Sequence, residues 1–147
     1  MPRRSLIAAA LAILLPLGLW AEAPSVDEAT IDDLRDFQGR WQVVAMKKDG
    51  AVVPETHWKD LQWSFQDDKL IQCAGAITCR QGRFRSDRTQ DPAELLITYS
   101  IGRPACYAFR IRGDQLEVAE NDSGEPPQGF TPDRGCNTLF ILRRVHK

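Results

Sequence analysis

Residues 37–44, with the sequence FQGRWQVV, mark the point at which the hydrophobic periodicity of the chain changes. Before this stretch, apolar residues recur every three to four positions, which is the spacing of an amphipathic helix. After it, apolar and polar residues alternate, as they do in a half-buried β-strand. The stretch therefore predicts the boundary between a short N-terminal helix, at about residues 26–37, and an all-β region.

The alternation continues from this boundary almost to the end of the chain. In residues 61–66 the apolar Leu61, Trp63 and Phe65 alternate with polar neighbours, and residues 107–112 repeat the pattern. Short turn sequences such as Asp49-Gly50 separate these runs. We predict eight strands, at residues 40–47, 60–66, 69–73, 77–85, 94–100, 105–112, 115–121 and 137–145.

Most of the predicted strands are joined by links of hairpin length, which favours an antiparallel meander over alternating strands and helices. A meander of this size can remove its two exposed edges by closing into an up-and-down barrel. Two links are longer: residues 51–59 are expected to form a lid over one mouth, and residues 121–136 an irregular loop. An eight-stranded barrel is either filled by side chains or holds one small ligand.

The N-terminal region has the pattern of an export signal. A basic start, Met1 to Arg4, is followed by the uncharged residues 6–20 and then by Ala21, after which we place the cleavage. The apolar run is shorter than the roughly 20 residues that span a bilayer, although an uncleaved anchor is the alternative. We predict a signal peptide at residues 1–21, a linker and helix start at 22–35, and a barrel domain at 36–147.

The charge of the chain is close to balanced, with 19 Lys and Arg against 20 Asp and Glu in 147 residues. So small a net charge gives no general attraction to nucleic acid or to acidic lipid. We therefore expect no nucleic-acid partner. From the length of the chain and the predicted leader we also expect a single domain, with no membrane span after signal cleavage. The protein is expected to be a monomer. The expected location is the periplasm or the extracellular medium.

Four cysteines follow the predicted leader: Cys73, Cys79, Cys106 and Cys136. An even number in an exported chain favours disulfides over metal-binding or catalytic thiols. Their spacing is not that of a zinc site, and the chain has only two histidines, so no metal is expected. The meander brings all four cysteines to one mouth. We favour the pairs 73–79, across a hairpin, and 106–136, at the long loop, and the other two connectivities stay open.

No catalytic motif stands out in the sequence. There is no nucleophile elbow, no H-E-x-x-H and no phosphate-binding loop, and neither His57 nor His146 has a nucleophile motif beside it. We therefore expect a protein that is not an enzyme, with no catalytic residue and no cofactor.

Several short motifs together resemble the lipocalins, and more specifically the planctomycete-type lipocalin-like domains, a set of exported bacterial proteins mostly of unknown function. The resemblance covers about residues 36–145 and rests on the order of FQGRWQVV, DGAVVPE (residues 49–55), LQWSFQDDKL (residues 61–70) and the last strand. It implies a lipocalin-like barrel in which Gly39 and Trp41 form the G-x-W motif of the first strand.

The resemblance also implies a structural role for Trp41. Its ring is expected to close the narrow end of the barrel, beneath a basic residue of the last strand. Arg143 and Arg144 both lie at the end of the last strand, which neighbours the start of the first strand in a closed barrel. Arg143 has the same strand parity as Leu139 and Ile141, and it is therefore the residue that we expect over the ring.

The barrel interior is the candidate functional site. In the first hypothesis, a small apolar ligand enters the lumen past Trp58. The alternative is that the aromatic residues of the lumen fill the barrel as its hydrophobic core. The expected lumen residues are Trp63, Phe65, Tyr99, Tyr107 and Phe109.

In a second hypothesis, the chain is a protein-interaction or envelope-associated module that uses its rim and outer face. Arg80, Arg110 and Arg112 are expected on that outer face, where arginine is favoured at interfaces. The sequence does not identify the ligand or the partner.

Overall fold

The structure of the protein is a computed structural model that describes residues 34–146. The predicted signal peptide (residues 1–21) and most of the predicted helix lie outside the described residues. Leu34 and Arg35 are helical and lead into a turn, which agrees with the predicted end of the helix. Within residues 34–146, no helix is long and apolar enough to cross a bilayer.

The described residues form nine strands and two short 3-10 helices. The strands form one antiparallel sheet in the order β2-β1-β3-β4-β5-β6-β7-β8-β9. Their bounds are β1 Gly39–Lys48, β2 Ala51–Val52, β3 Leu61–Gln66, β4 Lys69–Ala74, β5 Thr78–Asp87, β6 Glu94–Tyr99, β7 Ala105–Arg112, β8 Gln115–Glu120 and β9 Thr138–Arg144. The 3-10 helices are η1 (Glu55–His57) and η2 (Pro132–Arg134).

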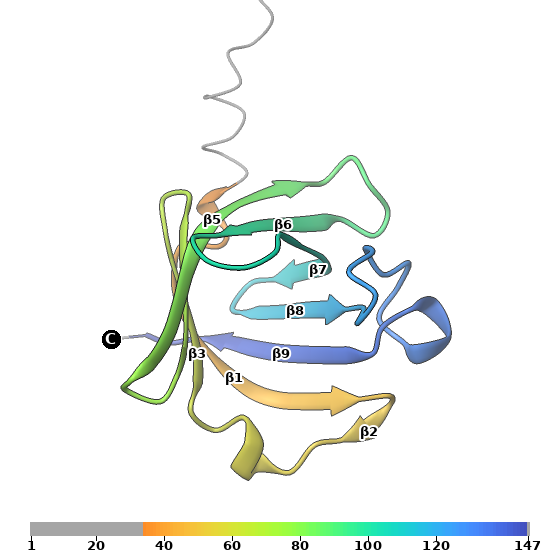
Figure 1. Cartoon of the computed structure of the whole chain (residues 1–147), viewed down its shortest axis with the longest axis horizontal. Coiled ribbons are helices and arrows are strands. Elements are labelled where there is room, and N and C mark those ends of the chain that lie inside the picture. Colours follow the sequence, from red (N-terminus) through yellow and green to blue (C-terminus); the bar gives the residue numbers. More distant parts are fainter. Residues whose placement is uncertain (1–33, 147) are drawn as a thin grey trace, which may run out of the picture.

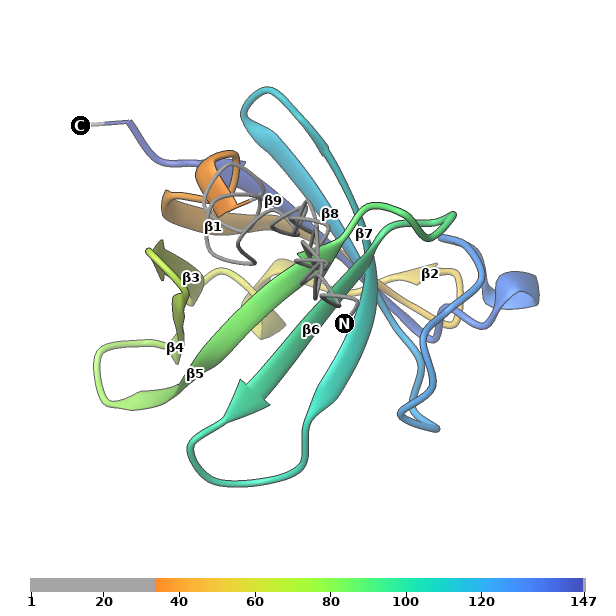
Figure 2. The ribbon, with the colours of Figure 1, turned by 90° about the horizontal axis from the view of Figure 1, so that it is seen from above.

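Strand β9 returns to pair with β1 and closes the sheet into a barrel (Figure 1). The barrel contains eight strands, β1 and β3 to β9, because β2 only extends the end of β1 by two residue pairs. The predicted eight-stranded up-and-down barrel is therefore confirmed. Figure 2 shows the barrel from above, with β5, β6 and β7 side by side in its wall.

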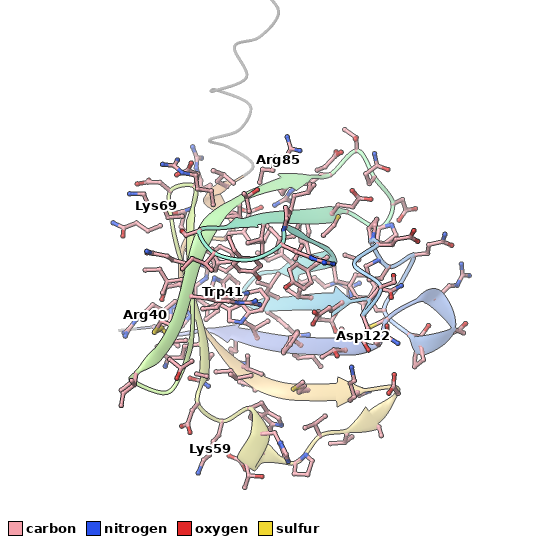
Figure 3. All side chains as sticks on the ribbon, viewed as in Figure 1. Arg40, Trp41, Lys59, Lys69, Arg85 and Asp122 are labelled. Carbon is pink, nitrogen blue, oxygen red and sulfur yellow. A yellow bond between two sulfur atoms is a disulfide. The ribbon has the colours of Figure 1, made fainter. Side chains whose placement is uncertain are left out.

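The base of the barrel is filled by a cluster of aromatic rings around Phe37. The ring of Phe37 is fully buried and lies 4.9 Å from Phe109, 5.3 Å from Phe65 and 5.5 Å from Phe84, measured between ring centroids. Trp41 is also fully buried and donates its indole N–H to the carbonyl of Phe37 at 2.7 Å. The turn that precedes β1 therefore plugs the base of the lumen. Figure 3 shows Trp41 among the side chains inside the barrel.

Arg144, at the end of β9, covers the Trp41 ring. Its guanidinium lies 4.3 Å from the ring centroid, donates to the backbone carbonyls of Gln38 and, at 2.7 Å, Asp36, and forms an ion pair with Asp114 at 3.1 Å. One side chain thus ties together the preceding turn, the first strand and the β7–β8 turn.

The expectation that Arg143 covers Trp41 is wrong. Arg143 is exposed. It lies on the same face of β9 as Leu139 and Ile141, and this face points outward rather than into the lumen. They belong to a second apolar cluster on the outer wall, beneath the loop of residues 121–137, which also contains Cys136. The inward residue is Leu142, which is fully buried, and Arg144 has the same parity.

This geometry predicts different effects for the two neighbouring arginines. In Arg144→Ala, the loss of the cation–π contact and of the charged hydrogen bonds should lower the free energy of unfolding by about 2–3 kcal/mol. In the control Arg143→Ala, the change should stay within about 0.5 kcal/mol. Urea unfolding monitored by tryptophan fluorescence measures both, and equal losses in the two variants would contradict the assignment.

Candidate functional site

The five aromatic residues predicted to line the lumen are all buried, but they fall into two groups. Phe65 and Phe109 pack against Phe37 and fill the base. Trp63 and Tyr107 line a cavity at the opposite mouth, and Tyr99 is hydrogen-bonded to Tyr107. The barrel is therefore filled by side chains at its base, as in the second of the two alternatives, and is hollow at its mouth.

The mouth cavity has a volume of about 250 Å³. One part of its wall is apolar and consists of Leu61, Trp63 and Phe140. The rest carries polar side chains, and the hairpin between β4 and β5 forms one rim. The polar side chains are Gln72, Thr78, Arg80, Tyr107 and Glu120.

Apart from a smaller hollow of about 190 Å³ at Pro132, two hollows of about 300 and 380 Å³ lie outside the lumen. The first is lined by outward residues of β3 to β5 such as Gln66 and Ile71, and the second lies beside Phe130 of the long loop. Neither is lined by a buried polar side-chain atom that lacks a partner, so within residues 34–146 the mouth cavity is the better candidate.

Gln72 organises the polar part of the cavity. Its side-chain carbonyl accepts hydrogen bonds from Arg80 Nε at 2.8 Å and from the Tyr99 hydroxyl at 3.0 Å. Because a guanidinium can only donate, these bonds fix which end of the amide faces Arg80. The amide nitrogen of Gln72 is buried and has no hydrogen-bond partner among the described residues. Only 8% of the residue is exposed.

The two tyrosines continue this network. Since the Tyr99 hydroxyl donates to Gln72, the Tyr107 hydroxyl, 3.1 Å away, donates to Tyr99. Burial raises the pKa of Tyr107 strongly, so the hydroxyl stays protonated and keeps a lone pair for a further donor. The Arg80 guanidinium stacks 4.0 Å above the Tyr99 ring, which holds it at the mouth.

The prediction that Arg80 lies on the outer face is wrong. Arg80 has the same parity as Gly82 and Phe84, which are buried, whereas Arg83 and Arg85 are exposed, and Figure 3 shows Arg85 pointing away from the barrel. The mouth end of β5 extends beyond the last β6 pair, Gly82↔Tyr99. Arg80 can therefore keep its terminal nitrogens in water while its guanidinium lies over the Tyr99 ring.

Glu120 places a carboxyl group in the wall of the same cavity. It follows Leu116 and Val118 on the lumen side of β8. Burial, and then the charge of Asp122, raise the pKa of Glu120, while Arg80 and Lys48 act in the opposite direction. No side chain within residues 34–146 forms a hydrogen bond or ion pair with this carboxyl. Sequence reasoning missed Gln72 and Glu120, and strand parity was the signal available for both.

Cys73 and Cys79 form the predicted disulfide across the β4–β5 hairpin, where they are directly paired in the sheet. The hairpin forms one rim of the cavity, so the bridge stiffens that rim. Trp58 of the predicted lid donates its indole N–H to Val53 and packs against the core, outside the cavity lining.

The expected bridge between Cys106 and Cys136 is not formed, and both are free thiols. Cys106 on β7 lies 3.8 Å from a carboxylate oxygen of Glu94, and burial together with that carboxylate raises its pKa to about 11. Cys136 is buried in the outer apolar cluster and donates to the Thr138 carbonyl at 3.4 Å. Each thiol is held by its own neighbours rather than by the other.

Metal binding finds no support in the described part of the chain. Within residues 34–146, no three or more His, Cys, Asp or Glu side chains gather closely enough to hold a metal ion. The mouth cavity contains one carboxyl, one guanidinium and one buried amide, which is a set suited to hydrogen bonding with a small molecule.

Comparison with known proteins supports the fold. No protein-family model matches the chain, and no curated protein matches it. Among solved structures, the chain is similar to a lipocalin-like protein from Bacteroides uniformis ATCC 8492, with a TM-score of 0.51 and 15% sequence identity. The match covers 75% of this chain and 99% of that one. The barrel is therefore lipocalin-like in fold.

The cysteine arrangement predicts a specific labelling pattern. Unfolding without reductant should expose only Cys106 and Cys136 to iodoacetamide, and non-reducing peptide mapping should find Cys73 linked to Cys79. Loss of this short closed loop in a C73S/C79S variant should lower the free energy of unfolding by about 2 kcal/mol. A peptide linking Cys106 to Cys136 in the native protein would contradict the structure.

Proposed function

We propose that the protein binds a small molecule in the mouth cavity of its barrel. The observation that carries the proposal is the buried amide nitrogen of Gln72, which points to a missing hydrogen-bond acceptor. A buried donor without a partner costs about 1–3 kcal/mol, and such groups are rare unless a ligand or water satisfies them. A ligand acceptor in this position would remove that cost on binding.

The cavity suggests the size and character of the ligand. Its volume of about 250 Å³ is just below the range of roughly 300–1,000 Å³ that is typical of drug-sized ligands. The ligand is therefore small or extends partly into solvent. Its apolar part would pack against Trp63, Leu61 and Phe140, and its acceptor would face Gln72.

The remaining sequence-based expectations form part of the same proposal. We propose that the chain is one of the planctomycete-type lipocalin-like domains, and that it acts in the periplasm or outside the cell. The Cys73–Cys79 disulfide supports an oxidising compartment. We propose a binding role rather than catalysis, as a monomer and without a cofactor.

A substitution that reverses one hydrogen-bonding group tests the binding site. In Gln72→Glu, one carboxylate oxygen can still accept from Arg80 and Tyr99, while the other replaces the free donor. Ligands with a carbonyl or carboxylate acceptor should therefore bind at least tenfold more weakly, which corresponds to about 1.4 kcal/mol. Quenching of tryptophan fluorescence, with Trp63 as the reporter, is measured across a panel of small amphiphilic acids, amides and esters.

Gln81→Glu is the matched control, because Gln81 is exposed on the outer face of β5 and undergoes the same change in charge. It should bind the panel like the wild type. Absence of any response of the wild-type protein across the panel, or equal binding by the Gln72→Glu variant, would contradict the proposed function.

A second candidate function is docking of the mouth rim on an anionic membrane surface. Ile77 and Ile101 are 95% and 92% exposed in the loops β4–β5 and β6–β7, which project from the same side of the barrel (Figure 2). The mouth-side residues 70–82 and 95–105 carry Arg80 and Arg103 and no Asp or Glu. Apolar tips that are flanked by two arginines and by no acidic side chain of these two segments fit the interface of an anionic bilayer, and we propose such a bilayer as the partner.

Vesicle binding tests this second function. The wild type should sediment with phosphatidylglycerol vesicles more than with phosphatidylcholine vesicles, and I77S/I101S should reduce the binding at least tenfold. Val52→Ser is the control, because Val52 is also exposed, at 78%, but lies on β2. Equal binding to both lipids, or an unchanged double variant, would contradict the membrane partner and leave a protein partner as the explanation of the exposed tips.

A further inference from the structure

Resting on the proposed function, we infer that the mouth cavity selects an apolar zwitterion, a small molecule that carries an anionic group, a cationic amine and an apolar side group. The inference goes beyond ligand binding because the cavity presents two opposite hydrogen-bonding ends. Arg80 and Gln72 form a donor end, and Glu120 forms an acceptor end.

The donor end is pre-organised by its own hydrogen bonds. Arg80 uses Nε to hold the Gln72 carbonyl at 2.8 Å and rests on the Tyr99 ring. Its terminal nitrogens form no ion pair with any acidic side chain of residues 34–146. Because Arg80 and the Gln72 amide are joined, the free guanidinium nitrogens and the free amide nitrogen can donate to one group. A carboxylate, with two acceptor oxygens, matches this pair of donors.

The acceptor end is the carboxyl group of Glu120, which forms an ion pair with neither Arg80 nor Lys48, the two nearby cations that act on it. Lys48, the lysine that acts on Glu120, bonds to Asp122 at 3.0 Å and to the Thr138 hydroxyl at 3.3 Å. Glu120 therefore remains half-buried in the cavity wall, with no ion pair to the rest of residues 34–146. An ammonium group of the ligand would supply both a charge and hydrogen-bond donors.

The balance of charges separates a zwitterion from simpler amphiphiles. A ligand with only a carboxylate would meet Arg80 favourably and Glu120 unfavourably, and one with only an amine would meet the reverse. The Tyr107 hydroxyl lines the same cavity as both charged groups. A molecule with both charges satisfies both ends at once, and its apolar group can pack against Trp63 and Phe140.

Three probes of nearly the same size and the same aromatic ring test the inference: phenylalanine, 3-phenylpropionate and phenethylamine. Isothermal titration of the wild-type chain should show phenylalanine binding at least tenfold more tightly than either of the singly charged probes. In Glu120→Gln, affinity for phenylalanine and phenethylamine should fall at least fivefold, while affinity for 3-phenylpropionate should hold or rise. Glu125→Gln, in the exposed loop, is the control and should bind like the wild type.

The outcomes separate this inference from the proposed function. If 3-phenylpropionate binds as tightly as phenylalanine, or if Glu120→Gln leaves the ratio between probes unchanged, the zwitterion assignment is overturned while small-molecule binding stands. If none of the three probes binds but the broader panel of acids, amides and esters does, the assignment is overturned in the same way. The comparison among probes on the wild type does not depend on any variant folding.

Discussion

Pairing of β9 with β1 closes the sheet and so gives the barrel its interior. Seven residue pairs join the two strands, with a bulge between Val43 and Ala45. Without this seam the two strands would present free edges, which are prone to pairing with other chains. Arg144 fastens the seam at the base, because it contacts Trp41 and the carbonyls of the preceding turn. Gly39, with φ of +112°, provides the bend at that turn that a side chain would oppose.

The plug at the base determines where a ligand site can exist. Phe37 and the rings around it pack closely in the lower lumen, and the lumen cavity lined by the described residues lies at the mouth beside Trp63 and Tyr107. Tight packing of the base also allows the mouth to carry polar side chains, since the apolar core that stabilises the barrel lies elsewhere. The close-packed aromatic core and the polar side chains of the lumen thus lie at opposite ends of one barrel.

The sequence predicted the barrel well because strand alternation is a local signal. Each barrel strand lies within two residues of its predicted bounds. The errors arose where a strand has a second apolar environment or ends in water. Strand β9 is apolar on both faces because the loop of residues 121–137 covers its outer side, which hid the inward parity of Arg144. Arg80 was assigned to the outer face because it is charged, yet at the mouth a lumen-facing arginine still reaches solvent. Pairing of Cys106 with Cys136 depended on how the long loop packs, and this packing is not a local property of the sequence.

The amide at position 72 distinguishes the mouth of the barrel from its hydrophobic core. Leu70, two residues earlier on the same face of β4, is fully buried, and a leucine at 72 would continue that face with no unsatisfied group. The chain instead places an amide there, uses its carbonyl for Arg80 and Tyr99, and leaves its nitrogen without a partner. A local departure from the rule that buried polar groups are satisfied is expected chiefly at functional positions. Glu120 lies on the opposite wall of the same cavity, half-buried and without a hydrogen bond or ion pair in the described chain, so the proposed ligand could reach both groups.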